Sequence, residues 1–223
     1  MSPKVRVSER PITIAVPKGR VLKALAPLLA RVGVDPAAIL GVPGEAEDRR
    51  LIRDLPELGW RLLLLKPDDV PTWVEYGAAD LGVCGRDVLV ERGFDLYQPL
   101  DLGIGRCQMV VAARASRDST LGSLPLPDPP RIATKYPRIA AEHFARKGIQ
   151  AEVVYVQGSV ELAPLTGLAD AIVDLVETGE TLRQNDLVVR EVVMEISSVL
   201  VANRSAYKLL GERARKVVAA FTS

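Results

Sequence analysis

Short apolar runs that end at glycine or proline alternate along this chain with segments of helical periodicity, and this alternation limits the fold more than any other feature. Residues 12–16 have the pattern of a short buried strand that stops at Pro17-Lys-Gly19. From Arg20, apolar residues recur at helical spacing as far as Gly33. A strand followed by a helix, repeated, predicts an α/β protein with a mostly parallel sheet and flanking helices.

The alternation forms two series, and the second begins near Cys107. We predict strands at residues 12–16, 61–66, 80–84, 109–113, 131–134, 152–156 and 170–176. We predict helices from residue 20 to Gly33 and at residues 74–76, 88–91, 137–147, 160–168 and 180–184. One long strand over 192–201 and one amphipathic helix over 208–221 then close the chain.

Two series predict two lobes. Residues 1–104 together with 192–223 form lobe I in this interpretation, and residues 105–191 form lobe II. The closing strand and helix return to lobe I because they have no third core to join. The cleft between lobes is a common place for a ligand, so we expect the active site there. A single continuous sheet is the alternative that periodicity leaves open.

Composition excludes several classes of protein. The net charge of +1, from 29 basic and 28 acidic residues, argues against general nucleic-acid binding, which needs a basic surface. No apolar run approaches the roughly 20 residues of a membrane span. The first residues lack the apolar core of a signal peptide, and the 2 cysteines form no CxxC pair. We therefore expect a soluble cytoplasmic protein with no membrane or nucleic-acid partner.

Single aromatic and histidine residues carry little functional signal. His143 is the only histidine, so histidine acid–base catalysis or a histidine metal cluster is not expected, and we interpret it as a helix-surface residue. Trp73 and Tyr76 fall near one helix face, which favours a place in the core over an adenine platform.

The segment Glu177-Thr-Gly-Glu-Thr181 follows a predicted strand directly and has the features of an anion-binding loop. Gly179 allows a backbone turn with positive φ, and the threonines add hydroxyl donors. A helix that starts near Thr181 would direct free N–H groups at the loop. Asp174, at the carboxyl end of the strand, could accept hydrogen bonds from sugar hydroxyls. An ordinary strand-to-helix turn with a threonine N-cap is equally compatible with the spacing.

Several motifs occur together, in order, over nearly the whole chain from Ile12 to about Lys208. They are Ile14-Ala-Val-Pro-Lys-Gly-Arg20, Asp69-Val-Pro-Thr-Trp-Val-Glu-Tyr-Gly-Ala-Ala-Asp-Leu-Gly-Val-Cys-Gly-Arg-Asp87, Arg131-Ile-Ala-Thr-Lys-Tyr-Pro137, Gly158-Ser-Val-Glu-Leu-Ala-Pro164 and Gly167-Leu-Ala-Asp-Ala-Ile-Val-Asp-Leu-Val176. In this order they resemble ATP phosphoribosyltransferase, the first enzyme of histidine biosynthesis.

The resemblance implies a two-lobed fold similar to type II periplasmic binding proteins. It implies that adenine N1 of ATP attacks C1 of 5-phosphoribosyl 1-diphosphate (PRPP), and that pyrophosphate leaves with inversion. Magnesium would be carried by the substrate polyphosphates, with no metal site of the protein's own. The chain stops soon after Asn203-Arg-Ser-Ala-Tyr-Lys208, as in short forms of the family. Such forms imply a homodimer within a hetero-octamer, with a regulatory subunit similar to histidyl-tRNA synthetase.

The resemblance also implies roles for single residues. Arg20 and Arg49 would contact the diphosphate as catalytic residues. Arg20 can also be a solvated first-turn residue, and without the resemblance Arg49 would be interpreted as half of a surface charge cluster. The PRPP-binding residues would be Asp174, Glu177, Thr178, Gly179, Glu180 and Thr181. The nucleotide-binding residues would be Lys18, Gly19, Asp80, Lys135 and Glu161.

Four of the expected nucleotide-binding residues also have interpretations without a role in ligand binding. Lys18 and Lys135 can also be solvated lysines, Asp80 a turn residue, and Glu161 a helix-cap carboxylate. Two other function classes remain compatible with the fold, namely a solute-binding protein and a non-catalytic relative that has lost the site.

Overall fold

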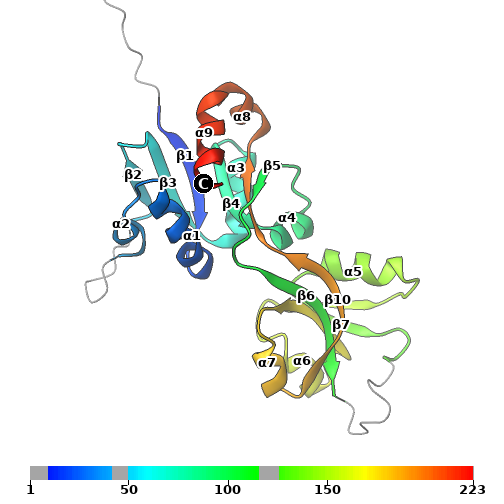
Figure 1. Cartoon of the computed structure of the whole chain (residues 1–223). Helices are drawn as coiled ribbons and strands as arrows, with labels where there is room; N and C mark the ends of the chain where they lie inside the picture. Colours follow the sequence, from blue (N-terminus) through cyan, green and yellow to red (C-terminus); the bar gives the residue numbers. More distant parts are fainter. Residues whose placement is uncertain (1–9, 42–49, 116–125, 223) are drawn as a thin grey trace, which may run out of the picture. The chain divides into compact units, whose positions relative to one another are not determined.

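A computed structural model describes residues 10–41, 50–115 and 126–222. The chain divides into two compact units, each with its own sheet (Figure 1). The first unit comprises Met1–Leu89, Phe94–Gly105 and Ser198–Ser223, and the second comprises Val90–Gly93 and Arg106–Ser197.

A six-stranded sheet in the order β2-β3-β1-β4-β11-β5 forms the centre of the first unit. Its strands are β1 (Ile12–Pro17), β2 (Ile52–Leu55), β3 (Trp60–Leu65), β4 (Leu81–Gly85), β5 (Tyr97–Asp101) and β11 (Ser198–Ala202). β1 pairs in parallel with β3 and β4, whereas β2, β11 and β5 add antiparallel pairs. The carboxyl ends of β1, β3 and β4 therefore lie at one edge of the sheet.

Helices cover both faces of this sheet. They are α1 (Arg20–Arg31), α2 (Pro36–Leu40), η1 (Pro67–Asp69), α3 (Val70–Glu75), α4 (Arg86–Arg92), α8 (Arg204–Leu210) and α9 (Glu212–Ala220). Leu25 of α1 and Val217 of α9 share one apolar core with Ile14. Val74 of α3 shares the core on the other face with Ala15. Because these cores lie on opposite faces of the sheet, the neighbouring residues Ile14, Ala15 and Val16 are all buried.

The expectation that Trp73 and Tyr76 belong to the core is wrong. Their side chains are 42% and 82% exposed. Val70 and Val74 form the buried face of α3. Trp73 and Tyr76 do not fall on that face of the helix.

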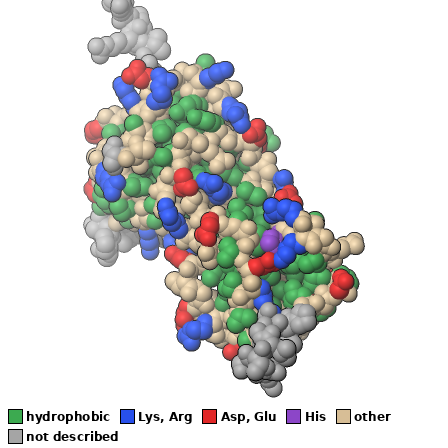
Figure 2. All heavy atoms as spheres, turned by 45° about the vertical axis from the view of Figure 1, so that its right-hand side comes forward, with side chains coloured by type: hydrophobic (Ala, Val, Ile, Leu, Met, Phe, Trp, Pro, Cys, Tyr) green, Lys and Arg blue, Asp and Glu red, His purple; other side chains and the backbone are tan. Residues whose placement is uncertain are grey.

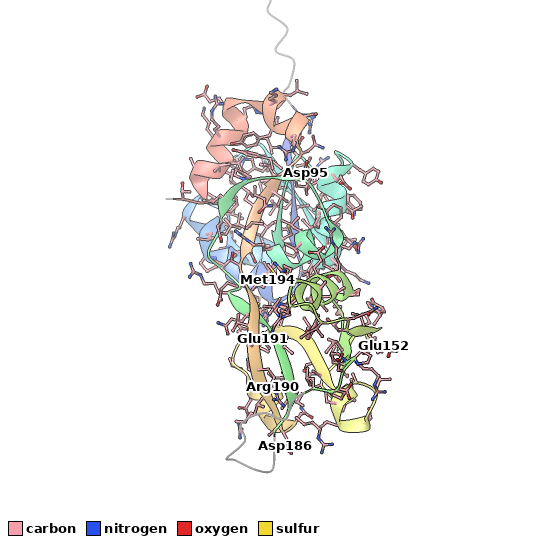
Figure 3. All side chains as sticks on the ribbon, turned by 90° about the vertical axis from the view of Figure 1, so that its right-hand side faces the viewer. Asp95, Glu152, Asp186, Arg190, Glu191 and Met194 are labelled. Atoms are coloured by element: carbon pink, nitrogen blue, oxygen red, sulfur yellow. The ribbon has the colours of Figure 1, made fainter. Side chains whose placement is uncertain are left out.

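The second unit has a five-stranded sheet in the order β10-β6-β9-β7-β8. Its strands are β6 (Cys107–Arg114), β7 (Arg131–Thr134), β8 (Glu152–Tyr155), β9 (Ala171–Val176) and β10 (Leu187–Ile196). β7 pairs in parallel with β8 and β9, and β6 pairs antiparallel with β9 and β10. Figure 3 shows Arg190, Glu191 and Met194 along the edge strand β10, and Glu152 on the opposite edge strand β8.

Three helices complete the second unit, namely α5 (Pro137–Arg146), α6 (Leu162–Thr166) and α7 (Glu180–Gln184). Ile139 and Phe144 of α5 pack on the face that includes Val173 of β9. Leu182 of α7 packs on the opposite face with Ile172. Two cores on one sheet place α5 on one face and α6 with α7 on the other (Figure 1).

The end of the chain differs from the sequence-based expectation. The predicted strand 192–201 is two strands, because β10 pairs with β6 as far as Ile196 and β11 pairs with β4 from Ser198. The boundary between units therefore falls between Ser197 and Ser198, later than residue 192. The predicted closing helix is also two helices, which meet at Gly211 with a φ of 53°.

Antiparallel strands make both sheets mixed rather than mostly parallel. β2 and β5 were not predicted, and β5 contains Pro99. Proline cannot donate to a sheet ladder, and β5 accordingly lies at an edge. None of the helices in the described ranges combines the length and apolar character that a membrane span requires.

Candidate active site

Three loops of the second unit meet at the carboxyl edge of its sheet. Lys135 follows β7, the segment 156–161 follows β8, and the segment 177–179 follows β9. The register pairs Thr134 with Tyr155 on one side and with Val173 on the other, so β7 and β8 end side by side while β9 continues to Val176. Polar residues at this edge are therefore neighbours although they are distant in sequence.

Asp174 stands at the centre of this edge, in the last half of β9. Burial raises the pKa of its carboxyl above the ordinary 3.8, while a hydrogen bond from the Leu175 N–H (2.8 Å) opposes the rise. The charge of Glu161 raises this pKa further, and that of Lys135 lowers it. The structure thus brings together three of the predicted site residues, Asp174 from β9 and Lys135 and Glu161 from the segments that follow β7 and β8.

The loop after β9 has the open backbone that an anion site needs. Gly179 has a φ of 75°, and a side chain there would meet only Val176, at 3.9 Å. Glu177 and Thr178 are exposed, and Thr178 Oγ1 accepts a weak hydrogen bond from the Glu180 N–H at 3.4 Å. α7 begins at Glu180 with Gly179 as N-cap, so neither threonine is the N-cap residue.

The carboxylate of Glu180 is engaged along α7. It accepts hydrogen bonds from Arg183 Nη2 (2.6 Å) and Nε (2.9 Å), and from Gln184 Nε2 (2.6 Å). These bonds lower the pKa of Glu180, first through Arg183 and then through Gln184. The negative charge beside the loop is therefore compensated within the helix.

The first unit offers a positive edge of a different kind. Lys18, Gly19 and Arg20 follow β1 and are exposed, and the Lys18 N–H donates to Leu65 O at 2.8 Å. Gly19 has a φ of 83° and is the N-cap of α1. The first turn of α1 carries no acidic residue and no side-chain cap, so its N–H groups favour an anion.

Comparison with known proteins decides the family. A model of the family HisG, ATP phosphoribosyltransferase, matches residues 66–223. The protein named ATP phosphoribosyltransferase from Sorangium cellulosum (strain So ce56) is 57% identical over 209 residues, which cover 94% of this chain and 93% of that protein. The chain belongs to the ATP phosphoribosyltransferase family. A protein of the same name from Anaeromyxobacter sp. (strain Fw109-5) is 50% identical over 210 residues, which cover 94% of this chain and 91% of that protein.

One solved structure agrees with this family, and a second shares the fold alone. The ATP phosphoribosyl transferase (HisG:HisZ) complex from Thermotoga maritima contains a chain with a TM-score of 0.78 and 32% identity, with 95% of this chain and 96% of that chain covered. The BvgS VFT2 domain from Bordetella pertussis has a TM-score of 0.56 at 16% identity, with 96% and 93% covered. The expected two-lobed fold, similar to periplasmic binding proteins, is thereby confirmed.

Within the first unit of this ATP phosphoribosyltransferase family member, Asp80 lies apart from Lys18, Gly19 and Arg20. It precedes β4, at the amino edge of the first sheet, whereas Lys18 follows the parallel strand β1. Its side chain is 2% exposed and accepts hydrogen bonds from both Nη atoms of Arg10 (2.8 and 2.6 Å) and from the Thr13 N–H (2.9 Å). These contacts describe a structural role for Asp80.

Arg10 was missed because residues 1–11 have the composition of a loose leader. The Arg10 guanidinium binds Asp80, and the Arg10 carbonyl oxygen accepts a hydrogen bond from Arg213 Nη2 at 2.9 Å. No local pattern signals either contact, since the partners are 70 and 203 positions away in the sequence.

Other expectations have mixed outcomes. Arg49 lies outside the described residues. Glu161 occupies the N-cap position of α6 but makes no side-chain cap hydrogen bond, so the alternative of a helix-cap carboxylate is wrong.

His143 is on a helix, as expected, but only 12% exposed, and its Nε2 lies 2.9 Å from Glu191 Oε1. Lys147 also pairs with Glu191, and Figure 2 shows basic, acidic and histidine side chains gathered on that face. The contact between His143 and Glu191 thus links α5 to β10.

Metal-ligating side chains do not gather in the described part of the chain. No group of three or more His, Cys, Asp or Glu residues there is placed to hold a metal ion. Cys84 and Cys107 are both buried, and burial raises the pKa of the Cys84 thiol, which opposes formation of a thiolate ligand.

Proposed function

We propose that this chain transfers the phosphoribosyl group of PRPP to N1 of the adenine of ATP. The C1–N1 bond forms as the C1–O bond to pyrophosphate breaks, with inversion at C1. The product is N1-(5-phosphoribosyl)-ATP, and the reaction is the first step of histidine biosynthesis. One observation carries the proposal within the structure: the loop after β9 combines an open Gly179 backbone with a compensated Glu180 and an adjacent half-buried Asp174.

The second unit supplies groups suited to PRPP. In our proposal, backbone N–H groups and hydroxyls of residues 177–181 hold the 5-phosphate, and Asp174 accepts hydrogen bonds from the ribose hydroxyls. Phosphate binding by backbone donors beside Gly179 does not require a basic side chain in the loop. Lys135 and Glu161 lie close enough to Asp174 to shift its pKa, so they would contact the substrates from the neighbouring loops.

The first unit supplies positive charge for the leaving group. The transition state develops positive charge on the ribose and negative charge on the pyrophosphate, and preorganised donors stabilise the latter. Lys18 and Arg20, with the uncapped first turn of α1, are the described groups suited to the diphosphate. Gly19 keeps this turn free of a side chain, and Arg49 joins this set by resemblance alone.

Magnesium would reach the site on the polyphosphate groups of the substrates. Mg²⁺ prefers oxygen ligands and usually binds through one or two carboxylates together with substrate phosphates. Asp174 and Glu161 are two carboxylates near enough to interact, and a cation would relieve their repulsion. The donor set therefore fits a substrate-borne ion, whose chemistry is to neutralise polyphosphate charge.

We also propose a regulatory subunit similar to histidyl-tRNA synthetase as partner. The solved relative from Thermotoga maritima is a HisG:HisZ complex, which supports a second kind of subunit. A homodimer of this chain within a hetero-octamer is the assembly that we propose.

A single assay tests the activity. The chain is incubated with ATP and PRPP, with and without the regulatory subunit, and phosphoribosyl-ATP is followed by absorbance. Product that requires both substrates, with an equal amount of pyrophosphate, supports the proposal. Absence of product in both conditions would contradict it. Binding of PRPP without turnover would then favour a solute-binding protein, and absence of binding would favour a non-catalytic relative.

A further inference from the structure

Thr134 is a buried hydroxyl at the carboxyl edge of the second sheet to which the sequence assigned no role. It is the last residue of β7, and its side chain is 0% exposed. Thr134 and Val173 are the last register pair of β7 and β9. The pairing of β7 with β9 therefore stops directly before Lys135 and Asp174, while β9 continues to Val176 beside β6.

The hydroxyl adds a side-chain hydrogen bond to that last pair. Thr134 Oγ1 donates a hydrogen bond to Val173 O at 2.6 Å and accepts one from the Tyr136 N–H at 2.8 Å. A threonine hydroxyl has one donor, and here it is used within the protein. Because Thr134 is also inaccessible, it is neither a nucleophile nor a direct ligand contact.

Each hydrogen bond of the Thr134 hydroxyl fixes the backbone beside a predicted site residue. Lys135 lies inside the short turn that the bond between Thr134 and Tyr136 closes, an arrangement in which a hydroxyl sets the local backbone. The Lys135 ammonium lies 5.9 Å from the centre of the Tyr136 ring. Asp174 directly follows Val173, whose carbonyl accepts the other bond. One oxygen atom thus links the backbone that carries Lys135 to the backbone that carries Asp174.

We propose that Thr134 is a positioning residue for PRPP, whose hydroxyl holds Lys135 and Asp174 at a fixed separation. This role rests on the proposed function of the site. In this proposal Lys135 contacts PRPP, rather than the nucleotide to which the resemblance assigned it. A cation and a carboxylate that bind different parts of one substrate must be correctly spaced before it arrives, since a small misplacement loses much of the binding energy. The opposing influence of Lys135 on the Asp174 carboxyl is consistent with their proximity.

The shape of Thr134 can be separated from its hydroxyl. Thr134→Val keeps the branched shape but removes the hydroxyl that joins the Tyr136 N–H to the Val173 carbonyl, which favours movement of both segments. Thr134→Ser keeps the hydroxyl and removes only a methyl group. Ile132→Val is the matched control, because Ile132 is fully buried on the same strand and its side chain takes part in neither hydrogen bond of Thr134.

The test measures melting temperature, the dissociation constant of PRPP by calorimetry in the absence of ATP, and the KM for each substrate. We expect Thr134→Val to weaken PRPP binding about tenfold or more, the size of effect that a lost buried hydrogen bond produces. Thr134→Ser should bind within about threefold of wild type, as expected for loss of one methyl contact. Ile132→Val should lower the melting temperature and leave PRPP binding unchanged.

Two results would overturn the positioning role: wild-type PRPP binding in Thr134→Val, or an equal loss of binding in Ile132→Val. If Thr134→Val does not fold, Thr134→Cys replaces it, since a thiol is a weak donor and acceptor. It should then bind PRPP more weakly than Thr134→Ser, and equal binding by both would also overturn the role. A wild-type chain that does not bind PRPP would instead contradict the proposed function itself.

Discussion

Arg183 holds the carboxylate of Glu180 with two hydrogen bonds, from Nη2 at 2.6 Å and from Nε at 2.9 Å. Both residues belong to α7, directly after the loop proposed to bind the 5-phosphate. An acidic residue next to a phosphate site is unfavourable by itself. The pair explains how Glu180 can occupy this position, because its charge is compensated three residues along the same helix.

Loss of Arg183 should therefore harm PRPP binding without harming the fold. In Arg183→Met the uncompensated Glu180 would repel the phosphate, and we expect the PRPP dissociation constant to rise about three- to tenfold. The double variant Glu180→Gln/Arg183→Met should regain most of the affinity. Both side chains are largely exposed, so the melting temperature should hardly change. Lys216→Met, in the exposed pair with Glu212 on α9, is the control and should leave PRPP binding unchanged.

Gly179→Val should abolish detectable PRPP binding. A β-branched residue strongly disfavours the φ of 75° that Gly179 adopts, so the loop would change its path or lose donors. Gly148→Val is a close control, because Gly148 has a φ of 73° and open space around it, after α5 and away from the loop. Both variants should lose about 1–2 kcal/mol of folding stability, measured by denaturant unfolding. Normal PRPP binding in Gly179→Val would refute the proposed phosphate loop.

Arg20→Ala should reduce turnover more than stability. Arg20 is exposed at the first position of α1, where a guanidinium can reach a diphosphate but adds little to the core. We expect kcat to fall about 100-fold, the usual scale for loss of one charge-stabilising donor. Arg31→Ala, at the exposed last turn of the same helix, should keep full turnover. A fall in melting temperature that accounts for the lost activity would contradict the catalytic role.

Asp80→Asn should affect stability rather than ATP binding. The substitution disturbs a buried side chain that accepts hydrogen bonds from Arg10 and from the Thr13 N–H, at a cost of about 1–3 kcal/mol in unfolding free energy. The KM for ATP should stay within about twofold, since no contact is lost at the carboxyl edge. Asp95→Asn, in an 88% exposed side chain paired with Arg204, should change neither quantity. A large rise in the ATP KM of Asp80→Asn would restore the nucleotide-binding role expected from the resemblance.

PRPP binding should depend on pH through Asp174. The ionised carboxylate accepts the ribose hydroxyls, so affinity should fall as pH drops toward a pKa that burial has raised above 3.8. Glu161→Gln removes one charge that raises this pKa, so the acidic limb of the affinity profile should move to lower pH. Lys135→Met should move the limb to higher pH. Identical acidic limbs in the two variants and wild type would contradict the coupling of these residues.

The raised pKa of Asp174 also affects folding stability. Its effect is opposite in sign to that of a salt-bridged carboxylate, whose pKa is lowered. A raised pKa in the folded state contributes stability below 3.8 that is lost as pH rises through the folded pKa. At neutral pH the buried, ionised Asp174 therefore opposes folding. Asp174→Asn should raise the melting temperature at pH 7 while it weakens PRPP binding, as is common at functional sites.

Local sequence patterns predicted some elements to the residue. β7 and α7 have the expected bounds, and β1 and α1 differ little from them. These segments carry their own signals, in the spacing of apolar residues and in the glycines and prolines that end them. The ordered motifs likewise indicated the family before the structure and the comparisons confirmed it.

The sequence by itself therefore determined the order of most strands and helices and the two-lobed class, and it predicted the segments that we propose carry the site. Tertiary structure alone decided which side chains meet. It divided the strand pattern near Ser197 between two sheets, joined Asp80 to Arg10, and set Thr134 against the backbone of Val173. The physical reason is that periodicity reports a residue's local conformation and its buried face, whereas a hydrogen bond across 39 or 70 positions exists only once the strands are paired.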